Sequence, residues 1–455
     1  METDVVVVGS GFAGFAAAIE AHDAGADVTM LEKMPLVGGN SIIAGGGINA
    51  VDPIRQALDN LEDSIQQHYD QTLWGGDYRG DPARVKRLVE EALAQVEWCE
   101  KEGITFADRV VMHTGSLFPR GHKAIEPGSS GRGLIMGLEA AAIDRGITIL
   151  TDHMVTGIIR EEPFQGGVLG VEVEANGDTL YFKARKAVVM GSGGFGHDYR
   201  LLNLHYPVIT EAIPSTNHIG ATGECLMYGQ DVGAHLVGMD FIQIHPYLGA
   251  PKPGRFSVDA RYNIMVNAEG NRFVAEDARR DVQSDAAFAQ TDGTFWMIWD
   301  DWGRKDLGKT DEVVEENVAA GNIFRGDTLE ELAEQIGTPA ENLVSAVTKY
   351  NQYVEAGEDP EFGKAESSMA FKLEVPPFYA HLQKPGIHHT MGGMLTNVEA
   401  QVIDRFGEPI PRFYAAGEAT GGIHGTNRLG GNATPDCLVF GRTAGANAAA
   451  EEPWG

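Results

Sequence analysis

The sequence predicts an α/β fold with two domains, the second inserted into the first. A β-branched run, Asp4 to Val8, leads directly into a glycine-rich turn and then into a helical segment. The chain has 455 residues, which exceeds what one hydrophobic core usually supports. Its composition changes after about Asp240, where Pro- and Gly-rich stretches begin. We therefore expect one domain from residues 1–240 and 386–455, and an inserted α+β domain from residues 241–385.

A glycine motif, GSGFAG, follows the first strand and opens a helix. Gly9 permits the tight turn, Gly11 lets backbone N–H groups reach a pyrophosphate, and Gly14 allows the helix to pack closely on the strand. The next predicted strand ends in Glu32, an acid at the spacing expected for binding a ribose hydroxyl. Together these features predict a Rossmann-type dinucleotide-binding domain.

A second glycine tract, residues 38–49, favours FAD over NAD as the dinucleotide. Several separate chain segments can close over a large, flat cofactor such as FAD, whereas NAD must enter and leave. The chain is expected to return to this cofactor at residues 191–196 and again at residues 218–223. The alternative is that residues 38–49 form a mobile glycine loop with no specific role.

Hydrophobic periodicity predicts the elements between these motifs. Apolar residues recur at helical spacing between residues 85 and 96, and Arg84, Lys86 and Arg87 are expected to lie on the solvated face of that helix. Alternating residues on both sides of Asn176-Gly177 predict a β-hairpin that decorates the main sheet.

The composition disfavours several classes of function. Lys and Arg number 35 and Asp and Glu number 65, and the net charge of −30 argues against nucleic acid and anionic membrane surfaces as partners. No apolar run approaches the roughly 20 residues that cross a bilayer, so we expect a soluble protein without a transmembrane segment. The isolated Cys99, Cys225 and Cys437 cannot build an iron–sulfur or zinc site and are expected to be buried thiols in a reducing, cytoplasmic compartment.

Residues 415–431, AAGEATGGIHGTNRLGG, combine a glycine-rich backbone with one acid, one histidine and one arginine. Glu418 could accept hydrogen bonds from a sugar-like hydroxyl chain, and Arg428 could hold an oxyanion by a two-pronged bond. We expect both at the edge of one ligand. The alternative is a glycine-rich turn with a surface ion pair.

Two adjacent histidines, His388 and His389, precede this segment. Successive side chains point to opposite sides of an extended backbone, so one can face the cofactor and the other a substrate. Metal binding is the competing interpretation, but no further His or carboxylate stands nearby at ligand-like spacing, and we expect no metal. Two structural histidines are a third possibility. Residues 277–281, which place two arginines between acids, are by themselves typical of a solvated charge run.

These motifs together resemble a known family. GSGFAG, LEKMPLVGGNS, QIHP, NAEGNRFVAED, GIHHTMGG and AAGEATGGIHGTNRLGGNA are similar to motifs of the FAD-binding fumarate reductase and succinate dehydrogenase flavoproteins. The resemblance runs nearly end to end and is closest to the soluble, single-subunit fumarate reductases and their relatives, such as urocanate reductase. It implies an FAD domain split by a mobile capping domain, with the active site between them.

The resemblance also bears on the cofactor and on the electron source. Membrane-bound members attach FAD covalently to a histidine, and Asn40 stands at the matching position, so FAD is expected to be non-covalent. The chain lacks the haem-binding CxxCH motifs of the flavocytochrome relatives. It is therefore expected to receive electrons from an external donor, which can be a reduced flavin, a flavin reductase or another redox protein.

Site residues are carried over from the family one by one. His388 and Arg428 resemble the pair that holds one substrate carboxylate, whereas His245 and Ser257 resemble the pair at the other end. The cofactor contacts implied by the motifs and the resemblance are Gly9, Gly11, Gly14, Glu32, Lys33, Gly39, Asn40, Ser41, Gly46, Gly47, Val155, Gly193, Thr222, Gly223, His389, Glu418, Gly431, Asn432 and Ala433.

Proton delivery is implied for two arginines. Arg280 matches the family's proton-donating arginine and Arg261 a second arginine of its relay. Because the pKa of arginine is about 12 or more, such a donor can work only transiently, with rapid reprotonation. The family's relay uses a glutamate where this chain has Val258, with Asp259 beside it, and Arg255 stands where an apolar residue usually lies near the substrate. The relay and the far-end specificity can therefore differ from those of fumarate reductases.

We expect an FAD-dependent oxidoreductase acting on CH–CH groups. It would reduce the C=C bond of a fumarate-like α,β-unsaturated carboxylate, with hydride from flavin N5 and a proton from Arg280. One alternative is a dehydrogenase or oxidase that desaturates a saturated acid, such as succinate or aspartate, or a 3-ketosteroid. The steroid is disfavoured because His388 and Arg428 suggest an anion. A remote alternative is a non-catalytic flavin-binding electron carrier.

Overall fold

The structure of the chain is a computed structural model that describes all residues except 114, 129, 249–259 and 455. It contains two compact units. The first unit consists of Met1–Glu211, Asn217–Gln243 and His388–Gly455, and the second unit of Ala212–Thr216 and Ile244–Ile387. The short segment Ala212–Thr216 thus belongs with the inserted part of the chain, which the composition of the sequence does not indicate.

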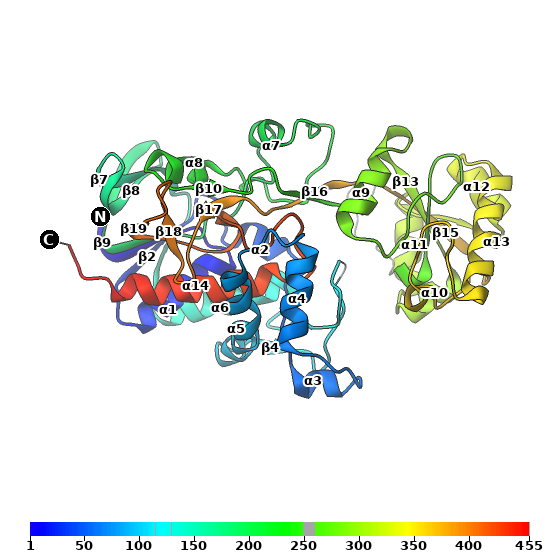
Figure 1. Ribbon diagram of the computed structural model, residues 1–455, viewed down its shortest axis with the longest axis horizontal. Coiled ribbons are helices and arrows are strands. Elements are labelled where there is room, and N and C mark those ends of the chain that lie inside the picture. The colour runs from blue at the N-terminus through cyan, green and yellow to red at the C-terminus, as the bar shows by residue number, and fades with distance from the viewer. Residues whose placement is uncertain (114, 129, 249–259, 455) are drawn as a thin grey trace. The chain divides into compact units, whose positions relative to one another are not determined.

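An eight-stranded sheet forms the centre of the first unit (Figure 1). Its order is β18-β19-β9-β1-β2-β6, and β8 pairs with both β9 and β7. The five strands from β19 to β6 are parallel, whereas β18, β8 and β7 add antiparallel pairs. Strand bounds are β1 Glu2–Val8, β2 Val28–Leu31, β6 Thr148–Leu150, β7 Met154–Glu162, β8 Gln165–Ala175, β9 Asp178–Met190, β18 Gln401–Ile403 and β19 Pro409–Ala415.

The strand β1 determines where a ligand can bind on this sheet. Val5, Val6 and Val7 are fully buried, as expected for a central parallel strand covered on both faces. Because β1 lies between β2 and β9, the strand order reverses beside it. Ligands of open α/β sheets bind at the carboxyl ends of the strands at such a reversal. The predicted Rossmann-type motif therefore stands at the expected edge of the sheet.

Two long helices, α1 (Phe12–Asp23) and α14 (Ala433–Ala450), pack against each other along the sheet (Figure 1). Their close approach requires glycine, because a Cβ added at Gly445 would lie 2.2 Å from the carbonyl oxygen of Ala17. The other helices of the first unit are α2 Gly39–Ile43, α3 Pro53–Ala57, α4 Ile65–Gly75, α5 Pro82–Lys101, α6 Ser130–Asp144, α7 Tyr199–His205 and α8 Glu224–Asp231.

The helix α5 corrects one prediction. Its apolar face is buried as the periodicity predicts, but Arg84 is only 1 % exposed. The Arg84 Nη1 donates hydrogen bonds to the Gly421 carbonyl oxygen, at 2.8 Å, and to the Thr396 hydroxyl, at 3.2 Å. The prediction of a solvated Arg84 is wrong, because distant segments supply acceptors for its guanidinium. Lys86 is exposed, as expected.

The predicted hairpin is confirmed. Asn176 and Gly177 both have positive φ, at 54° and 85°, as the tight turn between β8 and β9 requires. The strand that follows this turn, β9, runs without interruption from Asp178 to Met190. One long strand therefore belongs both to the hairpin and to the central sheet.

Three smaller sheets complete the first unit and the connections. The first is β3-β5-β4, the second is β10-β17-β20, and the third pairs β11 with β16, the two strands that carry the chain from one unit to the other. Their bounds are β3 Gly47–Asn49, β4 Thr105–Phe106, β5 Gly121–Glu126, β10 Leu236–Val237, β11 Ile242–His245, β16 Gly386–Thr390, β17 Gly393–Leu395 and β20 Thr420–Gly421.

The second unit is an α+β structure built on an antiparallel sheet of order β12-β13-β15-β14. The helices α12 and α13 bury Leu332, Leu343 and Val347 against Ile264 and Ile298 of the sheet. The bounds are β12 Ile264–Val266, α9 Arg280–Phe288, β13 Phe295–Asp300, α10 Asp301–Asp306, α11 Asp311–Ala319, β14 Phe324–Gly326, α12 Leu329–Ile336, α13 Ala340–Ala356 and β15 Phe378–Gln383.

Within the described parts of the chain, no helix combines the length and the apolar character needed to cross a membrane.

Candidate functional site

The first unit contains a cavity at the carboxyl ends of its central strands. Its empty volume is about 910 Å³, open solvent at the mouth included. The walls come from the turns that follow β1, β2, β9 and β19 and from the segments 38–41 and 218–225. The predicted cofactor contacts among its lining residues are Gly9, Gly11, Glu32, Lys33, Gly39, Asn40, Ser41, Val155, Gly193, Gly223 and Glu418.

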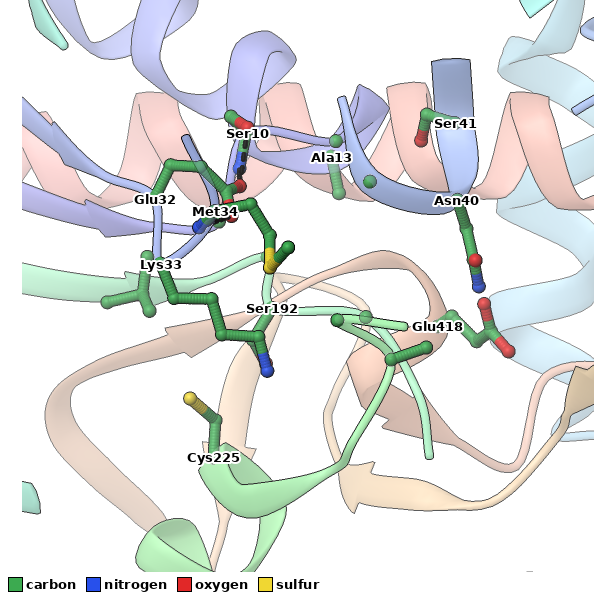
Figure 2. Close-up of a pocket in the computed structure, with 18 of the residues that line it drawn as sticks. Ser10, Ala13, Glu32, Lys33, Met34, Asn40, Ser41, Ser192, Cys225 and Glu418 are labelled. Atoms are coloured by element: carbon green, nitrogen blue, oxygen red, sulfur yellow. Dashed lines mark hydrogen bonds between the residues drawn. The ribbon is translucent and has the colours of Figure 1, made fainter. Parts of the chain in front are cut away.

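Glu32 is fixed at one wall of this cavity by backbone and hydroxyl donors. Its Oε2 accepts hydrogen bonds from the Ser10 amide, at 3.1 Å, and from the Ser10 hydroxyl, at 2.5 Å, and its Oε1 accepts one from the Met34 amide, at 2.8 Å. Figure 2 shows Glu32 pointing toward Ser10. A carboxylate offers about four acceptor positions. Glu32 can therefore still accept a hydrogen bond from a ribose hydroxyl.

The cavity offers contacts for the pyrophosphate and for one ribose of a dinucleotide. The helix α1 begins at Phe12, beside Gly11, and its 12 residues give a positive dipole end that suits a pyrophosphate. Gly14 lets this helix approach the strand, because an added Cβ would lie 1.9 Å from the Gly9 carbonyl oxygen. Glu32 offers the acceptor for the ribose. These features fit the FAD that the sequence predicts.

The rim beside Glu32 carries an ion pair. The ammonium group of Lys33 donates to the Thr222 hydroxyl at 2.6 Å and forms a short contact with Glu224, which itself accepts from Thr222. The structure thus brings the predicted Lys33 and Thr222 together. Glu224 was not predicted, although it follows the predicted Gly223 directly in the sequence.

A second acid, Glu418, lies across the cavity from Glu32. Its Oε1 accepts hydrogen bonds from the Thr390 amide, at 2.9 Å, and the Thr390 hydroxyl, at 3.2 Å. Figure 2 shows the side chains of Asn40 and Glu418 pointing toward one another. Burial raises the pKa of the Glu418 carboxyl above its usual value, and hydrogen bonds from Thr390 and Asn40 oppose that shift. Glu418 is therefore a lining residue and does not belong to a surface ion pair.

Asn40 links two segments of the cavity wall. Its amide Nδ2 donates to Asn217 Oδ1 at 2.6 Å, and its Oδ1 accepts from the His218 amide at 2.7 Å. These bonds hold the segment that begins at Asn217 against α2. A carboxamide at this position orders the wall but is not a nucleophile toward a flavin methyl group.

Asn49, the last residue of β3, connects this strand to the glycine tract at residues 430–431 and to the start of α14. The Asn49 amide donates to the Gly430 carbonyl oxygen at 2.7 Å and to Asn432 Oδ1 at 2.9 Å, and the Asn432 amide donates to the Thr72 hydroxyl at 3.0 Å. Asn432 is fully buried and directly precedes Ala433, the first residue of α14. Its side chain therefore fixes the start of α14, so that a contact with the cofactor would come from backbone atoms.

A buried arginine follows in the same loop. Arg428 is 6 % exposed, and it donates from Nη2 to Gln243 Oε1 at 2.9 Å and from Nη1 to the Leu429 carbonyl oxygen at 3.1 Å. Its buried Nε has no hydrogen-bond partner among the described residues. Burial lowers the pKa of Arg428 to about 10, against the opposing charge of Glu418, so the guanidinium stays cationic at neutral pH. This arginine has donor capacity left for an oxyanion.

Gln243 orients this arginine and was not predicted. Its Nε2 donates to Asn427 Oδ1 and to the Arg428 carbonyl oxygen, both at 2.7 Å, while its Oε1 accepts from the Arg428 guanidinium. Gln243 stands in the QIHP motif, two residues before His245. The sequence alone gives no sign that it contacts Arg428, which is 185 residues away along the chain.

The adjacent histidines lie on β16, as the extended-backbone prediction requires. His388 is half-buried, and His389 is 7 % exposed with its ring edge-on to His424, at 5.7 Å between ring centroids. The His424 Nε2 lies 3.2 Å from Asp436 Oδ2. Within the part of the chain that the structure describes, no three His, Cys, Asp or Glu side chains gather into a group that could hold a metal.

The second unit carries the other predicted residues. Arg280 is the first residue of α9 and is 7 % exposed, on the helix face that also buries Gln283, Ser284 and Ala287. Arg279 pairs with Asp281 at 2.6 Å. The solvated charge run expected from residues 277–281 alone is therefore wrong for Arg280, because helical spacing turns it inward.

Two further predictions concern residues before α9. His245, at the end of β11, is half-buried, and Arg261 is exposed, with its guanidinium 5.2 Å from the centre of the Tyr262 ring. The predicted Ser257 lies outside the described residues, as do Arg255, Val258 and Asp259.

Comparisons with known proteins agree with the predicted cofactor, FAD. A model of the family described as "FAD binding domain" matches residues 4–434. The chain is similar to a probable fumarate reductase of Shewanella frigidimarina, with 36% identity over 98% of this chain and 75% of the relative, and to a urocanate reductase of Eggerthella lenta, with 36% identity over 99% and 75%. Its fold matches the open conformation of a flavocytochrome c3 fumarate reductase with a TM-score of 0.82 and 36% identity, over 98% of this chain and 78% of that one.

Proposed function

The chain belongs to the FAD-binding family matched over residues 4–434 and is an FAD-dependent oxidoreductase of the fumarate reductase family, and we propose that it reduces the C=C bond of an α,β-unsaturated carboxylate. Relatives named for fumarate and for urocanate share 36% identity with it over nearly its whole length. The substrate class proposed here is therefore a small acid with a double bond conjugated to its carboxylate.

Arg428 is the observation that carries this proposal. It is a buried cation with an Nε–H that has no acceptor among the described residues, and Gln243 holds its Nη2 in place. Leaving a buried donor of a charged group unpaired is costly, typically about 1 to 3 kcal/mol or more. A substrate carboxylate would pair it. A neutral steroid would supply no such anion, so Arg428 favours an acid as the substrate.

The first unit would hold the cofactor and one end of the substrate. FAD would supply the hydride, and it would be bound without a covalent link because Asn40 stands where membrane-bound members carry a histidine. Arg428 and His388 would bind one carboxylate, which positions the double bond and stabilises the negative charge that develops toward that carboxylate. The half-buried Glu418 would accept a hydrogen bond from the hydroxyl chain of the cofactor.

The second unit would hold the other end of the substrate and deliver the proton. His245 and Ser257 would contact the far end, and Arg280 would protonate the α-carbon, with Arg261 helping to restore its proton. The burial of Arg280 supports this role, since a proton donor needs a fixed position and a surface charge does not. We further propose that this unit is a capping domain, and that electrons come from an external donor such as a reduced flavin, a flavin reductase or another redox protein.

Anaerobic mixing tests the proposed function. The purified holoenzyme is reduced and mixed with fumarate, urocanate or an aryl acrylate, and the return of the oxidised flavin absorbance is followed. At least one acid is expected to reoxidise the flavin, while the matching amide, which lacks the carboxylate, is not. If no acid in the panel reoxidises the flavin, the proposed reduction is refuted. Reduction of the oxidised enzyme by a saturated acid alone would instead assign the opposite direction.

A further inference from the structure

Tyr247 of the second unit makes two contacts that the sequence does not suggest. Its backbone amide donates a hydrogen bond to His245 Nδ1 at 3.1 Å. A nitrogen that accepts a hydrogen bond carries no proton, so the proton of the neutral imidazole is on Nε2. His245 is thereby set as an Nε2–H donor, the form that can donate to a carboxylate or carbonyl oxygen.

The hydroxyl group of the same tyrosine reaches the helix that begins with Arg280. It donates a short hydrogen bond to Gln283 Oε1, and the Gln283 Nε2 donates to the carbonyl oxygens of Glu276, at 3.2 Å, and Ala278, at 2.6 Å. Burial raises the pKa of the Tyr247 hydroxyl, so it stays protonated and remains a donor. Gln283 therefore ties the segment before Arg280 to Tyr247.

The other end of that segment is fixed by a buried ionic network. Glu276 accepts hydrogen bonds from the Met265 amide, at 3.0 Å, and the Arg272 guanidinium, at 3.0 and 2.9 Å. Its Oε2 also lies 3.2 Å from Lys364 Nζ. The side chains of all three charged residues are at most 2 % exposed. The backbone from Glu276 to Ala278 is thus held from two directions, two residues before Arg280.

We propose that Tyr247 and Gln283 are positioning residues that set His245 and Arg280 in fixed relation within the second unit. The backbone amide of Tyr247 orients His245, and its hydroxyl, through Gln283, orients the loop that presents Arg280. This inference deepens the proposed function, because it assigns the proton-delivering and far-end-binding side chains to one hydrogen-bonded assembly. It predicts that the Tyr247 hydroxyl affects turnover more than substrate affinity.

Three variants separate positioning from general stability. Tyr247→Phe removes only the hydroxyl, Gln283→Leu removes the bridging amide, and the matched control Tyr379→Phe removes another buried hydroxyl of the second unit, which donates to Asp301 at 3.1 Å. Tyr247→Phe and Gln283→Leu are each expected to lower kcat by about 10- to 100-fold, with KM changed by less than about threefold, because a small misplacement of a reacting group costs rate more than binding. The double variant is expected to be no slower than the slower single variant. Unchanged kcat in Tyr247→Phe, or an equal loss in Tyr379→Phe, would overturn the proposal.

Two further measurements do not depend on turnover and keep this inference separate from the proposed function. In holoenzyme labelled with ¹⁵N-histidine, the His245 signals, identified by their loss in His245→Gln, are expected to show the proton on Nε2 in the wild type and in Tyr247→Phe. Hydrogen exchange of the backbone at residues 276–280 is expected to be faster in Tyr247→Phe than in Tyr379→Phe. A proton on His245 Nδ1, or equal exchange in both variants, would contradict the assembly even if the enzyme reduces an unsaturated acid. If both results hold but no acid is reduced, only the proposed function fails.

Discussion

His68 is expected to make the stability of the first unit depend on pH. It is 1 % exposed, and its Nε2 lies 3.2 Å from Asn432 Oδ1, in the buried group that fixes the start of α14. The Asn432 oxygen can only accept, so the Nε2 of His68 carries a proton and donates to it. Burial, and then the positive charge of Arg120, lower the pKa of His68 from its ordinary value of 6.5 to about 4.

The sign and size of the effect follow from this shift. A histidine with a depressed pKa in the folded state contributes its full stability above its ordinary pKa, and the contribution is lost as the pH falls from about 6.5 toward 4. At about pH 5, His68 is protonated in almost every unfolded molecule but in only about one folded molecule in ten. The free energy of unfolding should therefore fall by about 2 kcal/mol between about pH 7.5 and pH 5 through His68 alone.

His68→Gln isolates this contribution. Glutamine keeps a donor near the position of Nε2 but does not titrate, and His235→Gln, which changes an exposed histidine of the same unit, controls for the loss of an imidazole. Urea unfolding of the holoenzyme is measured at both pH values, with the release of flavin as the signal. The stability advantage of the wild type over His68→Gln should shrink by about 2 kcal/mol at about pH 5. If the difference in free energy of unfolding between the wild type and His68→Gln is the same at both pH values, the interpretation of His68 as a buried neutral residue is refuted.

Three other substitutions test the proposed site. Arg428→Ala removes a buried charged contact of about 2 to 5 kcal/mol, so substrate affinity measured by titration should fall with or before turnover, and an unchanged affinity would argue against a carboxylate at this position. Arg280→Lys should collapse the rate of flavin reoxidation while FAD content and substrate affinity change little, whereas a surface charge would give near-normal kinetics. Ser10→Ala removes the shortest hydrogen bond to Glu32 and should weaken FAD binding by about 1 kcal/mol in a fluorescence titration, with Ser192→Ala of the same cavity as the control.

The sequence predicts those parts of the cavity that are formed by one short segment of the chain. The turn at residues 9–14 and Glu32 were found because a strand, a glycine turn, a helix and an acid follow one another at fixed spacing. Ser10 and Thr390 were not found, although each lies inside or beside a predicted motif. Their importance comes from the acid that each side chain contacts, 22 and 28 residues away, and no local pattern reports such a contact.

Two arginines were wrongly predicted to be solvated, and they show why a run of charged residues does not by itself indicate exposure. Arg84 and Arg280 both stand in charged runs at the start of a helix, where solvent is the usual environment for such residues. Burying a guanidinium is unfavourable unless acceptors are built around it. For Arg84 those acceptors are the Gly421 carbonyl and the Thr396 hydroxyl, both more than 300 residues away. A helical pattern reports which positions face inward, but only the distant chain decides whether a charge can stay there. The Gly421 carbonyl is at the end of β20, directly before the loop that continues to Arg428. One buried arginine thus helps to order the loop that presents the other, which is a reason to keep a costly charge in the core of the first unit.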